Sequence, residues 1–202
     1  IVEIPSDVGT MEVAEADLNY QPPKRALQSP ASSDVRDAVN LLLNAKKPVI
    51  WAGMGVLFAE ASPELTEFAE LTEIPVYCTM PGKSAFDDRH PLALGSGSAS
   101  TSLPARKWLQ ESDVLFAVGS SMTRTGYGQP IPGGKVIIQN VESIEDINKD
   151  FSVDVGLPGD AKLTLQALVD EVKSQLGANG RKGQSNVAKE IADLHDAWMG
   201  EW

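Results

Sequence analysis

The sequence contains one cysteine and two histidines among its 202 residues, which limits the chemistry open to it. A single cysteine excludes an internal disulfide, and Cys78 lies in the apolar run IPVYCTM, which favours a buried small side chain. His90 and His195 have no spaced Cys, His or carboxylate partners, so neither indicates a metal site, and both are expected to be structural or solvent-exposed. A G-x-S-x-G elbow is also absent, which disfavours a Ser-His-Asp hydrolase.

Positive charge and long apolar runs are scarce as well. The chain has 17 Lys and Arg against 28 Asp and Glu, a formal net charge of −11 that would repel a phosphate backbone. No apolar run approaches the roughly 20 residues that span a bilayer, and the first residues lack the basic region and cleavage site of a signal peptide. We therefore expect no nucleic-acid partner, no membrane partner and a cytoplasmic location.

What the chain does contain is a repeated unit of short apolar run, Gly- or Ser-rich turn and amphipathic helix. Apolar runs without alternation are typical of strands buried on both faces, and helices between them supply the crossovers that parallel strands need. The sequence thus predicts a doubly wound, Rossmann-like α/β fold with a parallel sheet of five to six strands. We expect core strands at 48–53, 74–79, 113–119, 135–140 and 153–157, and a long loop at 80–100. Helices are expected at 33–45, 62–72, 102–110 and 161–176, with Ser33, Ser62 and Asp160 as candidate N-caps.

The two ends differ in character from this middle part. Residues 1–8 read as a strand that needs neighbours, and 9–32 as an extended, proline-containing connection. Residues 177–186 read as a flexible linker, and 187–202 as a helix whose apolar face finds no partner in that linker. Because the chain also opens without methionine, we expect a piece of a longer protein, divided into residues 1–32, 33–176 and 177–202.

Candidate binding residues follow the predicted strands, because ligands of open parallel sheets settle at the carboxyl ends of the strands. Gly53 and Gly55 permit close backbone approach, but Phe58 stands where a full G-x-G-x-x-G motif has its third glycine, and a purely structural turn is the alternative. Lys83 lies in the next loop, which could equally be a loop without a ligand. Gly119 and Arg124 follow a buried strand; the arginine could clamp a diphosphate or pair with a neighbouring acid.

Three further candidates follow the last two strands. Asn140 and Glu142 stand where a side chain could accept hydrogen bonds from a ribose, and Asp160 could reach the same cleft. Asp160 is equally suited to cap the helix that it precedes. The acidic pair Asp87 and Asp88 beside Arg89 is expected to be a solvated turn.

Several segments together resemble a known family. KKPVIWAGMGV, ELTEFAELTEIPVYCTMPGKSAFDDRHPLALG, SDVLFAVGSSMTRTGYGQPIP, KVIIQNVESIEDINKD and VGLPGDAKLTLQALVDEV are similar, in order and spacing, to the central domain of thiamine-diphosphate-dependent enzymes of the acetolactate synthase, benzaldehyde lyase and oxalyl-CoA decarboxylase group. This resemblance implies the DHS-like NAD/FAD-binding topology. It also implies that IVEIPSDV closes a preceding pyrimidine-binding domain and that IADLHDAWMGEW leads into a following diphosphate-binding domain.

In that family the activating glutamate and the magnesium motif belong to those flanking domains, so the resemblance implies no catalytic residue and no metal ligand in this chain. It places FAD or ADP, in members that use them, in the cleft formed by Gly53, Gly55, Lys83, Gly119, Arg124, Asn140, Glu142 and Asp160. FAD-binding acetolactate synthases usually show Arg-Phe-Asp-Asp-Arg after the third strand and Met-His-Gly before it. SSMTRTGYG and SGSAST stand here instead, and this departure favours a vestigial or weakly occupied cleft.

The expected function is therefore a non-catalytic central domain of a carboligase or 2-oxo acid decarboxylase that uses thiamine diphosphate and Mg²⁺, a transferase or lyase that forms a homo-oligomer. One alternative is a stand-alone module that binds FAD or an adenine nucleotide. A sirtuin-like or transhydrogenase-like enzyme on the same topology is another, although the zinc cysteines of a sirtuin are absent.

Overall fold

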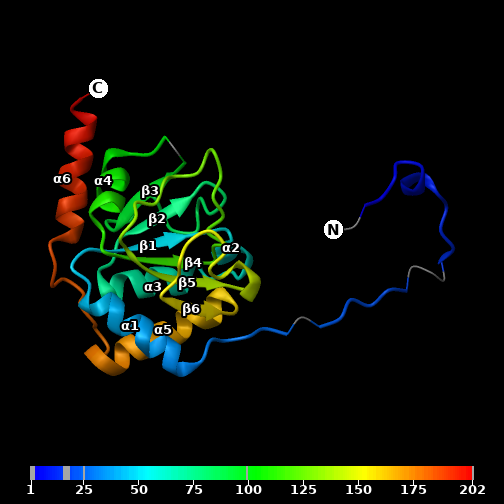
Figure 1. The fold of residues 1–202 in the computed structure, drawn as a ribbon, viewed down its shortest axis with the longest axis horizontal. Helices are drawn as coiled ribbons and strands as arrows, with labels where there is room; N and C mark the ends of the chain where they lie inside the picture. Colours follow the sequence, from blue (N-terminus) through cyan, green and yellow to red (C-terminus); the bar gives the residue numbers. More distant parts are fainter. Residues whose placement is uncertain (1–2, 16–18, 25, 99, 202) are drawn as a thin grey trace.

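The protein is built on one sheet of six parallel strands (Figure 1). The computed structural model describes residues 3–15, 19–24, 26–98 and 100–201. The strand order is β3-β2-β1-β4-β5-β6, and all five neighbouring pairs are parallel. This confirms the predicted doubly wound sheet. The strands are β1 (Pro48–Ala52), β2 (Val76–Thr79), β3 (Ala93–Gly97), β4 (Val114–Val118), β5 (Val136–Val141) and β6 (Val155–Pro158).

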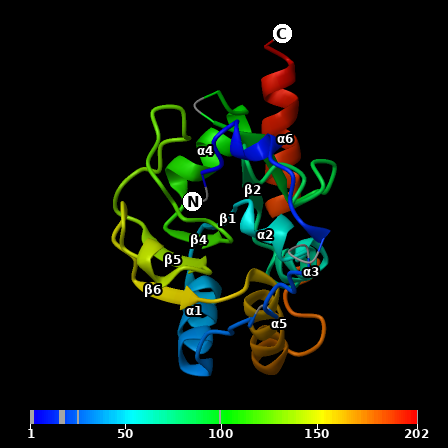
Figure 2. The same cartoon turned by 90° about the vertical axis from the view of Figure 1, so that its right-hand side faces the viewer.

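Helices cover both faces of the sheet. On one face α1, α3 and α5 pack together, and on the other α4 and α6 lie side by side (Figures 1 and 2). A short helix, α2, follows β1. The bounds are α1 (Ser32–Asn44), α2 (Gly55–Phe58), α3 (Ser62–Thr72), α4 (Leu103–Glu111), α5 (Ala161–Leu176) and α6 (Val187–Met199), with the 3-10 turns η1 (Val8–Thr10) and η3 (Ile144–Asp146).

Alternate residues of the central strands feed two separate cores. Ile50 and Phe116 pack among α1, α3 and α5, whereas Trp51 and Leu115 pack on the face that α4 covers. All four side chains are at most 7% exposed, which explains the continuous apolar runs in the sequence. Apolar side chains therefore cover both faces of the central strands.

Strand β3 lies within the segment predicted as a loop at 80–100. Its sequence, ALGSG, is short and rich in small residues, so it carries little β-propensity. Gly95 has a φ of 86°, and the register against β2 shifts between Val76 and Tyr77. An edge strand pairs on one side only, and this one forms through that pairing rather than through its own pattern.

Two predicted helix caps were wrong and two helix starts behave as expected. Ala31 and Ala61 occupy the N-cap positions of α1 and α3, and neither start has a side-chain cap. Ser102 caps α4 through the Ala105 amide, and Asp160 caps α5. A serine near a helix start indicates the neighbourhood of the cap, but the N-cap lies two residues before Ser33 and one residue before Ser62.

The N-terminal segment leaves the sheet and extends away from it (Figure 1). Residues 3–7 form no strand, and residues 8–10 form the turn η1, so the predicted strand at 1–8 is wrong where the structure describes it. Residues 1 and 2 of that prediction lie outside the described residues. A strand requires a partner strand, and the described sheet offers this segment none.

The segment 177–186 is held against α3, contrary to the prediction of a flexible linker. The carboxylate of Glu73 accepts hydrogen bonds from the amides of Gly183 (2.5 Å) and Ser185 (2.6 Å). The Arg181 amide donates to the Leu71 carbonyl at 2.7 Å. The direction in which the chain leaves the body is therefore defined by hydrogen bonds.

Helix α6 packs on α4, a partner outside the linker that the sequence did not indicate. Its Ile191 is 3% exposed and belongs to the core beneath α4. Lys47 binds Glu111 of α4 (2.7 Å) and Glu190 of α6 (2.5 Å), and its ammonium lies 4.2 Å from the ring centroid of Trp108. One lysine, directly before β1, thus contacts both helices of that face.

Candidate functional site

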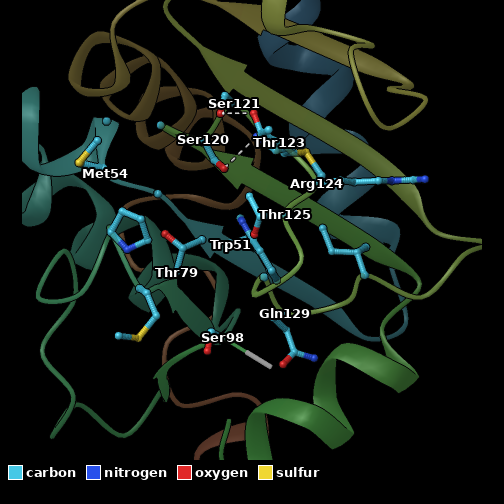
Figure 3. A pocket seen from close by; sticks show the side chains of 18 of the residues that line it. Trp51, Met54, Thr79, Ser98, Ser120, Ser121, Thr123, Arg124, Thr125 and Gln129 are labelled. Carbon is cyan, nitrogen blue, oxygen red and sulfur yellow. Dashed lines mark hydrogen bonds between the residues drawn. The ribbon is translucent and has the colours of Figure 1, made fainter. Parts of the chain in front are cut away.

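A cleft of about 1100 Å³ opens at the carboxyl ends of the strands. Five strands contribute to it, through Trp51 of β1, Thr79 of β2, Gly97 of β3, Gly119 just after β4 and Val141 of β5. The strand order reverses between β1 and β4, so the cleft lies at the switch point where open α/β sheets bind ligands. Figure 3 shows the side chains that line it.

Three of the predicted glycines meet at the floor of this cleft. A Cβ on Gly53 would lie 2.3 Å from the Gly119 carbonyl oxygen, and one on Gly119 would lie 2.5 Å from the Val56 amide nitrogen. The Gly53 amide donates to the Val118 carbonyl (2.9 Å) and the Gly55 amide donates to the Gly119 carbonyl (2.8 Å). The glycines thus allow close contact between the turns after β1 and β4, which agrees with the alternative of a purely structural turn. These two amides already have partners within the protein.

Arg124 lines the cleft but its guanidinium rests on an aromatic ring. The guanidinium carbon lies 4.6 Å from the Phe151 ring centroid, and the Arg124 amide donates to Asp150 at 2.8 Å. In Figure 3 the side chain points away from Trp51 and Thr79. Its contact with a diphosphate stays a prediction, and it would require the side chain to swing inward.

Lys83 and Glu142 are not brought to the cleft lining. The Lys83 ammonium binds Asp88 (2.6 Å) and the Ser96 hydroxyl (3.3 Å), and the hydrogen bond to Asp88 raises the pKa of Lys83 above its ordinary value. Glu142 is exposed and follows the lining residue Val141. Sequence spacing placed both residues at the carboxyl ends of the strands, as predicted, but could not show in which direction their side chains point.

Asn140 is fully buried and connects three elements. Its Oδ1 accepts from the Gly119 amide (3.1 Å), and its Nδ2 donates to Leu157 O (2.9 Å), Gly159 O (3.1 Å) and Thr164 Oγ1 (3.0 Å). With this environment Asn140 holds the turn after β4 against β6 and α5. Its predicted contact with a ribose remains untested, and the structure assigns the side chain a positioning role.

Asp160 serves as the helix cap that the sequence offered as an alternative. Its Oδ1 accepts from the amides of Lys162 (2.9 Å) and Leu163 (3.0 Å), two of the otherwise unpaired donors of α5. Asp160 is 6% exposed and is absent from the cleft lining in the described part of the chain.

The structure adds lining residues that the sequence did not single out. Trp51 stands at the centre of the cleft in Figure 3, where the sequence predicted only a buried strand residue. Gln129 lines the wall, and four large apolar side chains are exposed around the mouth. They are Met54 (44%), Phe58 (70%), Met80 (55%) and Tyr127 (87%). Of these, Met80 directly follows β2, and an apolar residue at that position was the available signal.

The cleft carries little charge. Among its described lining residues Arg124 is the one cation and Asp146 the one anion, and Asp146 is bound by Lys149 at 3.1 Å. Within the described ranges no three His, Cys, Asp or Glu side chains gather closely enough to hold a metal ion. The residues present therefore do not fit a Mg²⁺ site.

The remaining sequence predictions concern single side chains. Cys78 is 2% exposed, and burial raises the pKa of its thiol to about 11, so it is an unreactive core residue. His90 accepts from the Leu92 amide through Nδ1 and packs edge-on against Phe86, a structural role. Arg89 and Asp87 form an exposed ion pair, in the segment expected to be a solvated turn. Of the helices described, none is long and apolar enough to cross a membrane.

Comparison with known proteins gives this cleft a family context. Residues 35–168 match the family described as "Thiamine pyrophosphate enzyme, central domain", which is more than half of the chain. This chain belongs to that family. The central domain so identified contains the whole sheet, the glycine turns and the cleft-lining segment after β4.

Relatives carry the central domain as part of a longer chain. Acetolactate synthase large subunit of Corynebacterium glutamicum is 35% identical over 86% of this chain and 28% of its own length. A 3D-(3,5/4)-trihydroxycyclohexane-1,2-dione hydrolase of Bacillus cereus is 33% identical over 85% of this chain and 26% of its own. The chain thus spans about a third or less of the curated relatives that it matches.

A solved structure shares the fold at lower sequence identity. Benzoylformate decarboxylase from Polynucleobacter necessarius superposes with a TM-score of 0.65 at 21% identity, covering 91% of this chain and 33% of that chain. At this identity the likeness shows the fold alone, and it agrees with the parallel sheet described above.

Proposed function

We propose that this chain is the non-catalytic middle domain of a carboligase or 2-oxo acid decarboxylase of the acetolactate synthase type. The observation that carries the proposal is the central-domain match over residues 35–168 in a chain that spans 28% of an acetolactate synthase large subunit. In the parent, thiamine diphosphate supplies the electron sink for bond cleavage beside a carbonyl, and Mg²⁺ anchors its diphosphate. This chain's own residues position domains and shape the cleft.

The proposed partners are a pyrimidine-binding and a diphosphate-binding domain of the same parent chain, in a cytoplasmic homo-oligomer. Exposed apolar side chains in the segment before α1 support a neighbour there, because they gain stability only when another surface covers them. Met11 (65%), Val13 (60%) and Tyr20 (73%) are examples. On this view residues 1–32 and 177–202 are the connections and 33–176 the domain itself.

The cleft is proposed to receive FAD or ADP. Its place at the switch point and its volume support this, while its single cation, Arg124, supports weak occupancy. Gly53, Gly55 and Gly119 would form its floor. A stand-alone nucleotide module gains no support from the relatives, which carry this domain inside longer enzymes.

The decisive test is an activity measurement on the purified chain. With pyruvate, thiamine diphosphate and Mg²⁺ we expect no carbon dioxide above a protein-free blank, and no heat of thiamine diphosphate binding in calorimetry. An acetolactate synthase large subunit assayed in parallel is the positive control. Carbon dioxide release by this chain alone would refute the non-catalytic assignment.

A further inference from the structure

Two buried polar atoms of the cleft lining have no hydrogen-bond partner among the described residues. One is the indole Nε1 of Trp51, a donor, and the other is Oε1 of Gln129, an acceptor. Trp51 is 7% exposed, so its N–H has lost water without gaining a protein acceptor. Most buried polar side-chain atoms in native structures are hydrogen-bonded, so an unpaired donor or acceptor in a cleft points to a partner such as water or a ligand.

Packing orients the Trp51 indole, and the Gln129 amide uses only its nitrogen within the protein. The Trp51 ring packs at 4.9 Å, centroid to centroid, against the fully buried Tyr77, which fixes the plane of the indole. The Gln129 Nε2 donates to the Pro130 carbonyl at 3.4 Å, so the amide nitrogen is engaged and the oxygen is left over. The protein therefore holds one unsatisfied donor and one unsatisfied acceptor in a single cleft.

The surroundings of this pair are apolar rather than cationic. Met54, Phe58, Met80 and Tyr127 surround the mouth, and the guanidinium of Arg124 is stacked on Phe151. A diphosphate brings two or three negative charges, which need several donors or cations to replace their water. A flat uncharged ring loses little on entering such a cleft and gains contact with aromatic faces.

From this we infer that the cleft recognises an uncharged planar heterocycle that carries a carbonyl beside an N–H, through Trp51 Nε1 and Gln129 Oε1, and that phosphates contribute little. The ring carbonyl accepts from Trp51 and the ring N–H donates to Gln129. The inference rests on the proposed nucleotide cleft and names the part of the ligand that the cleft selects.

Access to the pair requires a small movement of the segment 120–131. Both atoms are shielded from solvent, and this segment lies beside Trp51 in Figure 3. Residues 123–128 are exposed, and Met122 is the buried anchor of this stretch in the described structure. Few apolar contacts oppose its displacement, which is the condition for local opening at low cost.

Flavin fluorescence measures this directly, with riboflavin as the phosphate-free probe. We expect riboflavin and FAD to bind within about threefold of each other, and ADP and inorganic pyrophosphate to compete at least tenfold more weakly. Trp51→Phe keeps an aromatic ring but removes the N–H, and should weaken riboflavin about fivefold to tenfold, as expected for one hydrogen bond. Gln129→Met should do the same. Trp198→Phe on α6 is the matched control and should change nothing.

The outcomes separate the two proposals. If ADP or pyrophosphate binds as tightly as FAD and riboflavin does not bind, the ring-led inference is wrong while the nucleotide cleft survives. If none of the four probes binds, both fail and only the central-domain assignment remains. Riboflavin binding that Trp51→Phe and Gln129→Met leave unchanged, with melting temperatures equal to the parent chain, would also overturn the assigned contacts.

Discussion

The contact between the turns after β1 and β4 can be tested by separating backbone strain from collision. Gly119 has both a positive φ of 59° and no room for a Cβ, which would lie 2.5 Å from the Val56 amide nitrogen. Gly53 has no room but an ordinary φ, whereas Gly134 has a φ of 83° with open space around it. Gly133 has neither constraint. Alanine at each of the four positions therefore isolates each effect.

The expected losses follow from these differences. Gly134→Ala should cost about 1–2 kcal/mol of unfolding free energy, the price of a left-handed backbone. Gly53→Ala should cost about 1–3 kcal/mol through overpacking, and Gly119→Ala about 2–5 kcal/mol because both effects act there. Gly133→Ala should lie within about 1 kcal/mol of the parent chain or be slightly stabilising.

Urea unfolding followed by circular dichroism gives these free energies, and the slopes of the four transitions should agree. If Gly119→Ala costs no more than Gly134→Ala, the two turns are not in close contact and the reasoning fails. Equal losses at Gly53 and Gly133 would show the same.

Three other perturbations test the structure around the cleft. Asn140→Ala should cost about 2–4 kcal/mol by thermal unfolding, because it leaves the Gly119 amide and buried carbonyls unpaired; a loss below 1 kcal/mol would contradict that. In Glu73→Asn the asparagine tolerates the φ of 54°, but its side chain is too short to reach the amides of Gly183 and Ser185. Trypsin should therefore cut after Arg181 or Lys182 several times faster, at an unchanged melting temperature. Burial alone would raise the pKa of Asp113, but the Lys46 and Lys47 amides that it accepts from bring its pKa below the ordinary 3.8. The stabilisation from these two hydrogen bonds is complete above pH 3.8 and is lost as pH falls through the lowered pKa. Asp113→Asn should therefore lower the unfolding free energy by about 1–2 kcal/mol at pH 7 and by progressively less in acid. A difference in unfolding free energy that stays constant down to pH 2 would refute the assignment.

The sheet could be predicted from the sequence because its strands are buried on both faces. PVIWAG and DVLFAVG are apolar runs of the length of a buried strand, and the helices predicted between such runs favour parallel pairing of the strands. ALGSG could not be found in the same way, because an edge strand forms through its neighbour's hydrogen bonds and carries little signal of its own. The seating of α6 on α4 was missed for a related reason, since it depends on residues 82 positions apart such as Trp108 and Glu190.

The candidate site was predicted at the carboxyl ends of the strands, where the cleft lies, but four of its eight residues do not line that cleft. Strand ends can be located from sequence, so Gly53, Gly55, Gly119 and Arg124 all reach the cleft. The direction of a side chain depends on its partners, and Lys83 forms an ion pair with Asp88, an acid five residues away. Trp51 was overlooked because a tryptophan within a buried strand normally satisfies its N–H, and only coordinates reveal one that does not.

The connection from β4 to β5 contains no helix, unlike the connections from β1 to β2 and from β3 to β4. A crossover made of loop can change in length and sequence without disturbing strand pairing, because the β4–β5 register depends on hydrogen bonds within the sheet. Substitutions between residues 120 and 131 would thus alter which molecule enters while the framework stays constant. Such a division would let one scaffold serve enzymes with different ligand requirements, and it makes this loop the first place to compare among relatives.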